Sequence, residues 1–305
     1  MQKLLSRLII NAVIILSLLV VASNAHSASW TSMNSGTTND IWDIWGSSDS
    51  NVFSVGSEGT ILYYSGSSWN TMSSGTTNSL YGICGSSSSD VYAVGEKGTI
   101  LYYSGYSWSS MSSGTTCDLN SVWGNSNSSV FSAGSEGTIL HYNGSSWNTM
   151  SSGTTNSLYG VWGNSETDVF AVGESSTILH YNGSAWVSMS SGVSCDLTGV
   201  WGTSASNVYA VGFASGDQYI VLRYNGSSWS SMSTGSAIWL WDTWGSSSSD
   251  IFAVGEYFDD SSGTIFHYNG SSWSEMKNDI ANWLYGIWGT SSSDVFAVGA
   301  RILVQ

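Results

Sequence analysis

Short apolar runs alternate with Gly, Ser, Asn and Asp along almost the whole chain. One period of this pattern contains four runs: LYGICG at 80–85, DVYAVG at 90–95, TILYYS at 99–104 and SWSSM at 107–111. The runs are short and rich in Val, Ile, Tyr and Trp, which favours β-strands, and no helical periodicity is present. We name these predicted strands A, B, C and D, in chain order.

The four-strand pattern recurs seven times. A tryptophan in strand D, followed three residues later by a methionine, marks each copy: Trp30, Trp69, Trp108, Trp147, Trp186, Trp229 and Trp273. The first five tryptophans are 39 residues apart, and the last two spacings are 43 and 44. Four strands in about 40 residues are typical of a propeller blade. We therefore predict an all-β, seven-bladed β-propeller with four antiparallel strands per blade.

The two ends of the chain complement each other. SWTSM at 29–33 is a strand D without its own blade, whereas the chain ends with DVFAVG (294–299) as strand B and RILVQ (301–305) as strand C. Pairing of 29–33 with the C-terminal blade would close the ring and remove its open edges. An open solenoid would need capping repeats, and neither end has one.

Residues 1–25 have the pattern of a secretory signal peptide. Lys3 and Arg7 precede a 15-residue apolar run at 8–22, and Ser23 and Ala25 suit a cleavage site. The run is shorter than the ~20 residues of a membrane-spanning helix. We expect cleavage after Ala25, a secreted (periplasmic or extracellular) protein without membrane insertion after cleavage, and one propeller domain over 26–305.

The repeat resembles a known family. The pattern L-x-x-V-W-G, then D-V-F-A-V-G-E-x-G-T-I-L-x-Y-x-G-S-S-W, is similar to bacterial neuraminidase repeat (Asp-box-like) propellers, in particular the branch that contains photosystem II assembly-factor propellers. The resemblance covers nearly all of 26–305 and implies a propeller fold. The turn departs from the Asp-box, because Asn143 lies four residues before Trp147 where the box has Asp five residues before Trp. Asn-Gly at 143–144 is a tight-turn signal, so we expect these turns to be scaffold.

Composition narrows the function that the resemblance implies. Sialidase activity in that family needs three arginines for the substrate carboxylate, and only Arg223 and Arg301 follow residue 25. The resemblance to assembly-factor propellers implies a basic surface. This chain has a net charge of −15, which weakens the assembly-factor interpretation. An acidic surface also repels nucleic acid and anionic lipid, so we expect neither as a partner.

Four tryptophans depart from the repeat. Thirteen of the 17 tryptophans occupy regular positions in strands A and D, whereas Trp42, Trp239, Trp241 and Trp283 are extra. We number the blades in chain order, starting from the strand A near Trp42. The four tryptophans lie at or just before the start of strand A in blades 1, 6 and 7, which are neighbours across the ring closure. Because successive strands of a blade run in opposite directions, the D–A and B–C connections share one face of the ring, which we call the D–A/B–C face. Two longer B–C loops, 212–219 and 255–263, lie on this face, as do the four tryptophans. Loops on a rigid scaffold commonly carry binding residues.

These irregularities predict one binding sector. The predicted ligand-binding residues are Trp42, Asp43, Trp239, Trp241, Asp242, Trp283, Tyr285, Tyr257, Asp259 and Asp260. Aromatic faces beside carboxylates suit a sugar, a cationic group or a peptide loop. We predict a non-catalytic, monomeric binding propeller whose ligand is a glycan or an extracytoplasmic protein segment. A simple packing role for the extra aromatic rings is the alternative within this sector.

Two other functions stay open. Asp43 and Asp242 lie two blades apart and form a candidate carboxylate pair for a glycoside hydrolase. A scaffold or assembly role in the cell envelope is the second alternative. We expect no cofactor and no metal, because the three histidines of strand C (His141, His180 and His267) lie on separate blades. We expect Cys84, Cys117 and Cys195 to be free thiols, and Asp90, Asp168, Asp250 and Asp294 before strand B to be structural.

Overall fold

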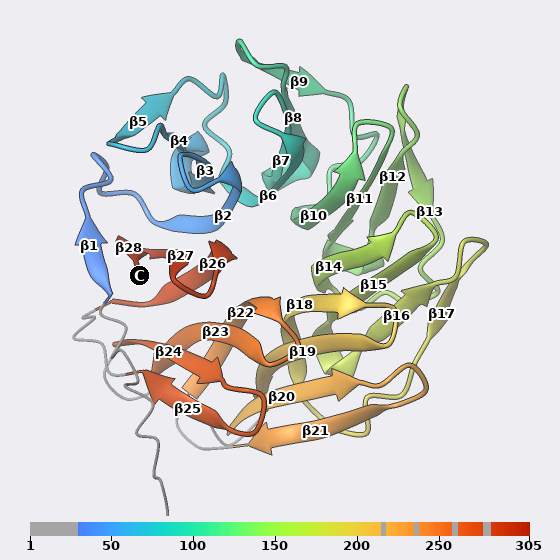
Figure 1. The fold of residues 1–305 in the computed structure, drawn as a ribbon. Coiled ribbons are helices and arrows are strands. Elements are labelled where there is room, and N and C mark those ends of the chain that lie inside the picture. The colour runs from blue at the N-terminus through green and yellow to red at the C-terminus, as the bar shows by residue number, and fades with distance from the viewer. Residues whose placement is uncertain (1–29, 215–217, 235–237, 258–261, 277–281) are drawn as a thin grey trace, which may run out of the picture.

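The computed structural model describes residues 30–214, 218–234, 238–257, 262–276 and 282–305. Seven four-stranded antiparallel sheets stand around a central axis, as Figure 1 shows. The prediction of a seven-bladed propeller with four strands per blade is confirmed. The predicted signal peptide at 1–25 lies outside the described residues.

Strand A of each blade is the innermost strand, and neighbouring A strands contact one another around the ring. The A strands are β2 (Ile41–Ser48), β6 (Leu80–Ser87), β10 (Leu119–Ser126), β14 (Leu158–Ser165), β18 (Asp196–Ser204), β22 (Ile238–Ser247) and β26 (Leu284–Ser291). The B strands are β3 (Asn51–Gly56), β7 (Asp90–Gly95), β11 (Ser129–Gly134), β15 (Asp168–Gly173), β19 (Asn207–Ala214), β23 (Asp250–Tyr257) and β27 (Asp294–Gly299).

Strands C and D complete each blade toward the outside. The C strands are β4 (Ile61–Tyr64), β8 (Thr99–Tyr103), β12 (Ile139–Tyr142), β16 (Ile178–Tyr181), β20 (Gln218–Tyr224), β24 (Gly263–Tyr268) and β28 (Ile302–Val304). The D strands are β5 (Trp69–Met72), β9 (Trp108–Met111), β13 (Trp147–Met150), β17 (Trp186–Ser188), β21 (Trp229–Thr234), β25 (Trp273–Met276) and β1 (Thr31–Met33).

The ring closes as predicted. β1 pairs antiparallel with β28, with Thr31 opposite Val304 and Met33 opposite Ile302. The N-terminal strand thus supplies strand D of the C-terminal blade, and Figure 1 shows the two ends side by side. The strand is shorter than the predicted range of 29–33, because it begins at Thr31 and Ser29 lies outside the described residues.

The hydrophobic core lies between blades. Most clusters join the B and C strands of one blade to strand A of the next: Val94 and Ile100, for example, pack with Leu119 and Val122. Aromatic rings extend this packing outward, since Tyr92 meets Trp147 edge-on with ring centroids 6.1 Å apart. Burial of one continuous apolar layer per interface fixes each blade against its neighbours.

The B–C connections differ from the predicted loops in two blades. In blades 1 to 4 they are short 3-10 turns: η1 (Ser57–Gly59), η2 (Glu96–Gly98), η3 (Ser135–Gly137) and η4 (Glu174–Ser176). In blades 5 and 6 we expected long loops at 212–219 and 255–263, but the strands themselves extend, to Ala214 in β19 and to Tyr257 in β23. The extra residues add backbone pairs such as Phe213 with Tyr219, so they lengthen a hairpin.

The described cysteines are free, as expected. Cys84 and Cys195 are buried and Cys117 is partly exposed. Burial raises the pKa of Cys84 well above its usual value and that of Cys195 to about 11. Both thiols are therefore protonated at neutral pH and are poor nucleophiles. Within the described ranges, no helix is long and apolar enough to cross a membrane.

Candidate functional site

One equivalent position near the start of strand A, which we call the mouth position, lines the mouth of the central channel in all seven blades. These residues are Trp42, Tyr81, Asn120, Tyr159, Thr198, Trp241 and Tyr285, and Phe213 joins them from the B–C hairpin of blade 5. Together they surround a hollow of about 400 Å³ on the D–A/B–C face. This volume lies within the range of small-ligand pockets.

A β-bulge aims each of these side chains into the mouth. In every blade the pairing of strands A and B shifts register around the mouth position. In blade 2, for example, Leu80 pairs with Gly95 and Gly82 pairs with Val94, so that Tyr81 between them has no partner in strand B. The preceding Leu80 is fully buried between blades. Bulges commonly redirect a side chain at a functional edge, and here the repeat does so seven times.

Five aromatic residues form a continuous wall on one side of the mouth. We call this wall the aromatic arc: Tyr81, Trp42, Tyr285, Trp241 and Phe213. Neighbouring ring centroids along the arc are separated by 6.5, 4.5, 6.1 and 5.6 Å. The closest pair, Trp42 and Tyr285, is tilted by 47°. The arc spans blades 5, 6, 7, 1 and 2, and all its members are half-buried.

Below the mouth, the next residue of strand A, which we call the floor position, lines a smaller hollow of about 200 Å³. This residue is glycine in four blades, because adjacent A strands approach too closely for a side chain. A Cβ on Gly199, for instance, would lie 2.9 Å from the Cα of Asp242. The exceptions are Asp43, Ser121 and Asp242, which supply the polar floor.

The two floor carboxylates join neighbouring blades. Asp43 accepts hydrogen bonds from the backbone N–H of Ile44 at 2.7 Å and from that of Ile83, in the next blade, at 2.8 Å. Asp242 repeats this pattern with Thr243 at 2.8 Å and Ile287 at 3.0 Å. Each carboxylate therefore satisfies two backbone donors that line the channel.

Burial disfavours the charged form of both floor carboxyls. Loss of water, together with the charge of Asp242, raises the pKa of Asp43 well above its usual value. Burial raises the pKa of Asp242 to about 6, and its two backbone hydrogen bonds oppose this shift. Asp242 therefore gains a proton on mild acidification, and Asp43 is also harder to ionise than a free aspartate.

The structure brings together half of the residues predicted from the sequence. Trp42, Asp43, Trp241, Asp242 and Tyr285 line the channel or its mouth. Three others lie beside it and do not line either hollow: Trp239 stacks on Phe213 at 5.0 Å, Trp283 meets Tyr285 edge-on at 6.3 Å, and Tyr257 donates a hydrogen bond to Glu275 at 2.5 Å. Asp259 and Asp260 lie outside the described residues.

Sequence reasoning missed five residues that line the mouth: Tyr81, Asn120, Tyr159, Thr198 and Phe213. Departures from the repeat were the criterion, and Tyr81 and Tyr159 are the regular residues of their blades. The available signal was positional. Trp42 is equivalent to Tyr81, so the residue at the mouth position of each blade belongs to the same ring around the channel. Phe213 lies in the longer hairpin that the sequence did mark.

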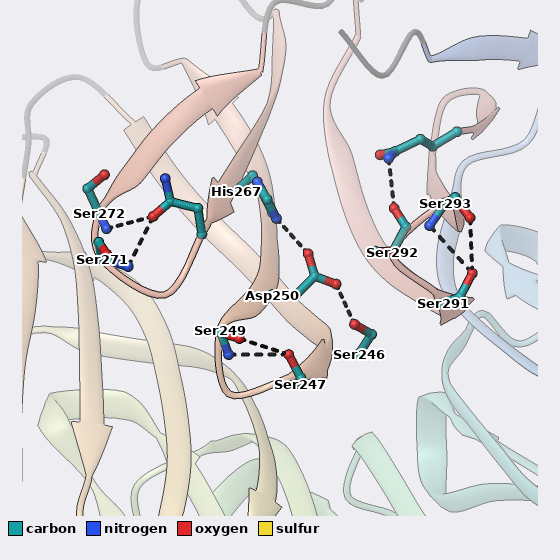
Figure 2. Close-up of polar contacts among 12 residues, drawn as sticks. Ser246, Ser247, Ser249, Asp250, His267, Ser271, Ser272, Ser291, Ser292 and Ser293 are labelled. Carbon is teal, nitrogen blue, oxygen red and sulfur yellow. Dashed lines mark hydrogen bonds and ion pairs between the residues drawn. The ribbon is translucent and has the colours of Figure 1, made fainter. Parts of the chain in front are cut away.

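Serine, aspartate and histidine also meet on the opposite face, at the A–B turn of blade 6. Asp250 accepts a hydrogen bond from Ser246 on one carboxylate oxygen, and its other oxygen lies 2.7 Å from His267 Nε2 (Figure 2). In a catalytic triad the histidine contacts the serine, whereas here the aspartate separates them. His180 and Asp168 repeat the histidine contact at 2.6 Å, so the arrangement is a strand-to-strand tie of the repeat.

This result agrees with the structural role expected for the histidines and for the aspartates before strand B. In blades 4 and 6 the aspartate at the start of strand B contacts a histidine of strand C. The ring stacks on a phenylalanine of strand B, as for His267 on Phe252 at 4.6 Å. Among the described residues, no group of three potential metal ligands is present.

No family model matches the chain, and the comparison with curated proteins found no relative. Solved structures do share its fold. YCF48 bound to a D1 peptide superimposes with a TM-score of 0.70 at 16% identity, covering 90% of this chain and 94% of that one. YCF48 from Cyanidioschyzon merolae superimposes with a TM-score of 0.70 at 16% identity, covering 91% of this chain and 98% of that one. The WD40 propeller of Doa1 superimposes with a TM-score of 0.74 at 15% identity, covering 90% of this chain and 97% of that one. These likenesses establish the seven-bladed propeller architecture of the chain.

Proposed function

We propose that this protein is a non-catalytic binding propeller that holds a protein segment at the mouth of its central channel. The aromatic arc carries the proposal, because five half-buried rings border a hollow large enough for one or two side chains of a ligand. Aromatic rings give much contact area at small entropic cost. A propeller of the same architecture, YCF48, has been solved with a D1 peptide, which supports a protein ligand over a glycan.

The floor carboxylates favour binding over hydrolysis. Both oxygens of Asp43 and of Asp242 accept backbone N–H groups, so these carboxylates hold the A strands together. No arginine or histidine among the described residues lines the channel to orient such a pair. The glycoside hydrolase alternative predicts that wild type cleaves chromogenic glycosides and that Asp242→Asn does not.

We further propose a relationship to the Asp-box-like propellers and secretion after removal of residues 1–25. The repeat pattern carries the first proposal and the charged, apolar and small-residue order of the leader carries the second. The partner would then be an extracytoplasmic protein, which includes the envelope scaffold role as one form of the same function. N-terminal sequencing of the exported protein tests the cleavage site.

Binding is tested with a peptide display library and a glycan array probed side by side. We expect wild type to enrich peptides and the double variant Trp42→Ala/Trp241→Ala to bind them at least tenfold more weakly, because it removes the two largest rings of the arc. Tyr106→Ala is the control, since Tyr106 is 93% exposed and lies in the turn between β8 and β9, outside the hollow. Absence of enrichment, or binding that survives the double variant, would refute the proposal. A glycan signal lost in the double variant would assign a sugar instead.

A further inference from the structure

Negative charge lies at and near the mouth of the channel. Asp43 and Asp242 form its floor. Burial raises the pKa of Tyr285 in the arc, and the charges of Glu256 and Asp40 add to this shift, although neither of these two residues lines the hollow. Glu256 is only 5% exposed, and one of its carboxylate oxygens has no hydrogen-bond partner in the described chain. Buried carboxylates are costly unless a positive group or several donors compensate them.

The described part of the chain supplies no positive group at this place. Arg223, on strand C of blade 5, donates a hydrogen bond from its Nε to Asn207 Oδ1 at 2.9 Å. Its guanidinium lies over the ring of Tyr209, 5.9 Å from the centroid. Neither it nor Lys97 nor Arg301 lines the channel or the mouth. A cationic ligand would bring a positive charge to this place.

The arc adds a second attraction for a cation. The face of an aromatic ring carries negative potential, and tryptophan gives the strongest cation–π interaction. Two tryptophans and two tyrosines of the arc border the mouth, with Trp42 and Tyr285 only 4.5 Å apart. Aromatic rings are not metal ligands, and the described residues hold no metal-binding cluster, so the site suits an organic cation over a metal ion.

We propose that the channel mouth recognises a lysine side chain of the bound protein segment, with its stem against the aromatic arc and its ammonium group directed at the floor carboxylates. This inference rests on the proposed function, because it names the chemistry of the segment. A compact ammonium on a slender stem fits the narrow lower hollow better than a planar guanidinium.

Nα-acetyl-lysine methylamide and Nα-acetyl-norleucine methylamide are the probes. They share an apolar stem and differ in the ammonium group. Binding is followed by indole N–H shifts in 15N-tryptophan-labelled protein, with Trp42 and Trp241 assigned from their leucine variants. We expect the lysine derivative to bind at least tenfold more tightly than norleucine and to shift both signals. Trp42→Leu and Trp241→Leu should each weaken lysine binding several-fold, whereas Tyr106→Leu, on a 93% exposed residue, should not.

Charge at the floor is tested separately. Asp242→Asn should reduce the preference for lysine over norleucine. If Asp242→Asn does not fold, Asp40→Asn removes a charge that acts on Tyr285 of the arc without removing a tie between blades, and it should reduce the same preference. Equal binding of both probes, or a lysine preference that the leucine variants do not change, overturns the inference. Equal binding at the arc together with peptide enrichment still leaves the proposed binding function standing. Failure of peptide enrichment as well removes both.

Discussion

A tryptophan of strand A packs over a glycine of the next blade at six of the seven interfaces. Trp123 covers Gly163 in this way, and a Cβ built on Gly163 would lie 2.5 Å from the indole ring. Blade 2 is the exception, because Cys84 stands at the tryptophan position and Gly124 of blade 3 meets Val130 instead. At these six interfaces the tryptophan of strand A therefore contacts the equivalent glycine of the next blade, as Trp123 does with Gly163 40 positions later.

Gly163→Ala tests this contact at a single residue. The added methyl group would force Trp123 out of its position, and such overpacking costs about 1–3 kcal/mol of unfolding free energy. Gly124→Ala is the matched control, because no tryptophan covers Gly124 and its nearest neighbour is Cγ2 of Val130 at 2.8 Å. Urea unfolding of both variants should show a larger loss for Gly163→Ala. Equal losses would contradict the packing explanation.

At the scale of elements, polar residues at the floor position tie neighbouring A strands together. Asp43 joins β2 to β6, Asp242 joins β22 to β26, and the Ser121 hydroxyl accepts the N–H of Val161 at 3.2 Å between β10 and β14. The sequence did mark the two aspartates, but as ligand-binding residues. Their bonds to the next blade depend on how closely the A strands approach, which a one-dimensional pattern does not contain.

The Asp242 tie predicts a pH dependence of stability. The folded pKa of about 6 exceeds the ordinary value of 3.8, so the folded state holds this proton more tightly than the unfolded state. Stability from this group is therefore complete below pH 4 and falls as the pH rises through 6, by up to about 3 kcal/mol. Asp242→Asn cannot titrate and, at every pH, keeps only one oxygen to accept the two N–H groups of Thr243 and Ile287.

Urea unfolding of wild type and Asp242→Asn at pH 4, 5.5 and 7.5 measures this effect. We expect the stability advantage of wild type to be largest at pH 4 and to shrink toward pH 7.5. Ser121→Ala is the control, because Ser121 makes the equivalent tie without an ionisable group, and its cost should not change with pH. An advantage that grows with pH would disprove the raised pKa of Asp242.

On the scale of the whole molecule, repetition made the architecture predictable and concealed part of the candidate site. Strand number, blade number and closure follow from period and strand order, because each repeat folds against its neighbours alone. The mouth is different, since each blade contributes one residue and a ligand would contact the ring as a unit. Tyr159 conforms to the repeat and Trp241 departs from it, yet both line one hollow. Their convergence appears only after the ring has closed.

Ring closure itself is the last property of the whole molecule that can be tested. β1 contributes three residues, of which Met33 packs with Ile302 in the cluster that joins blades 7 and 1. Without β1, the backbone of β28 would be an open strand edge, which favours pairing with another molecule. A variant lacking residues 1–33 should therefore unfold at lower temperature than one lacking residues 1–28, and should associate as its concentration rises. Thermal unfolding and light scattering of the two variants measure both effects. Identical melting temperatures and a monomeric state for both would show that the hydrophobic contacts between blades 7 and 1 hold the ring without the β1–β28 ladder.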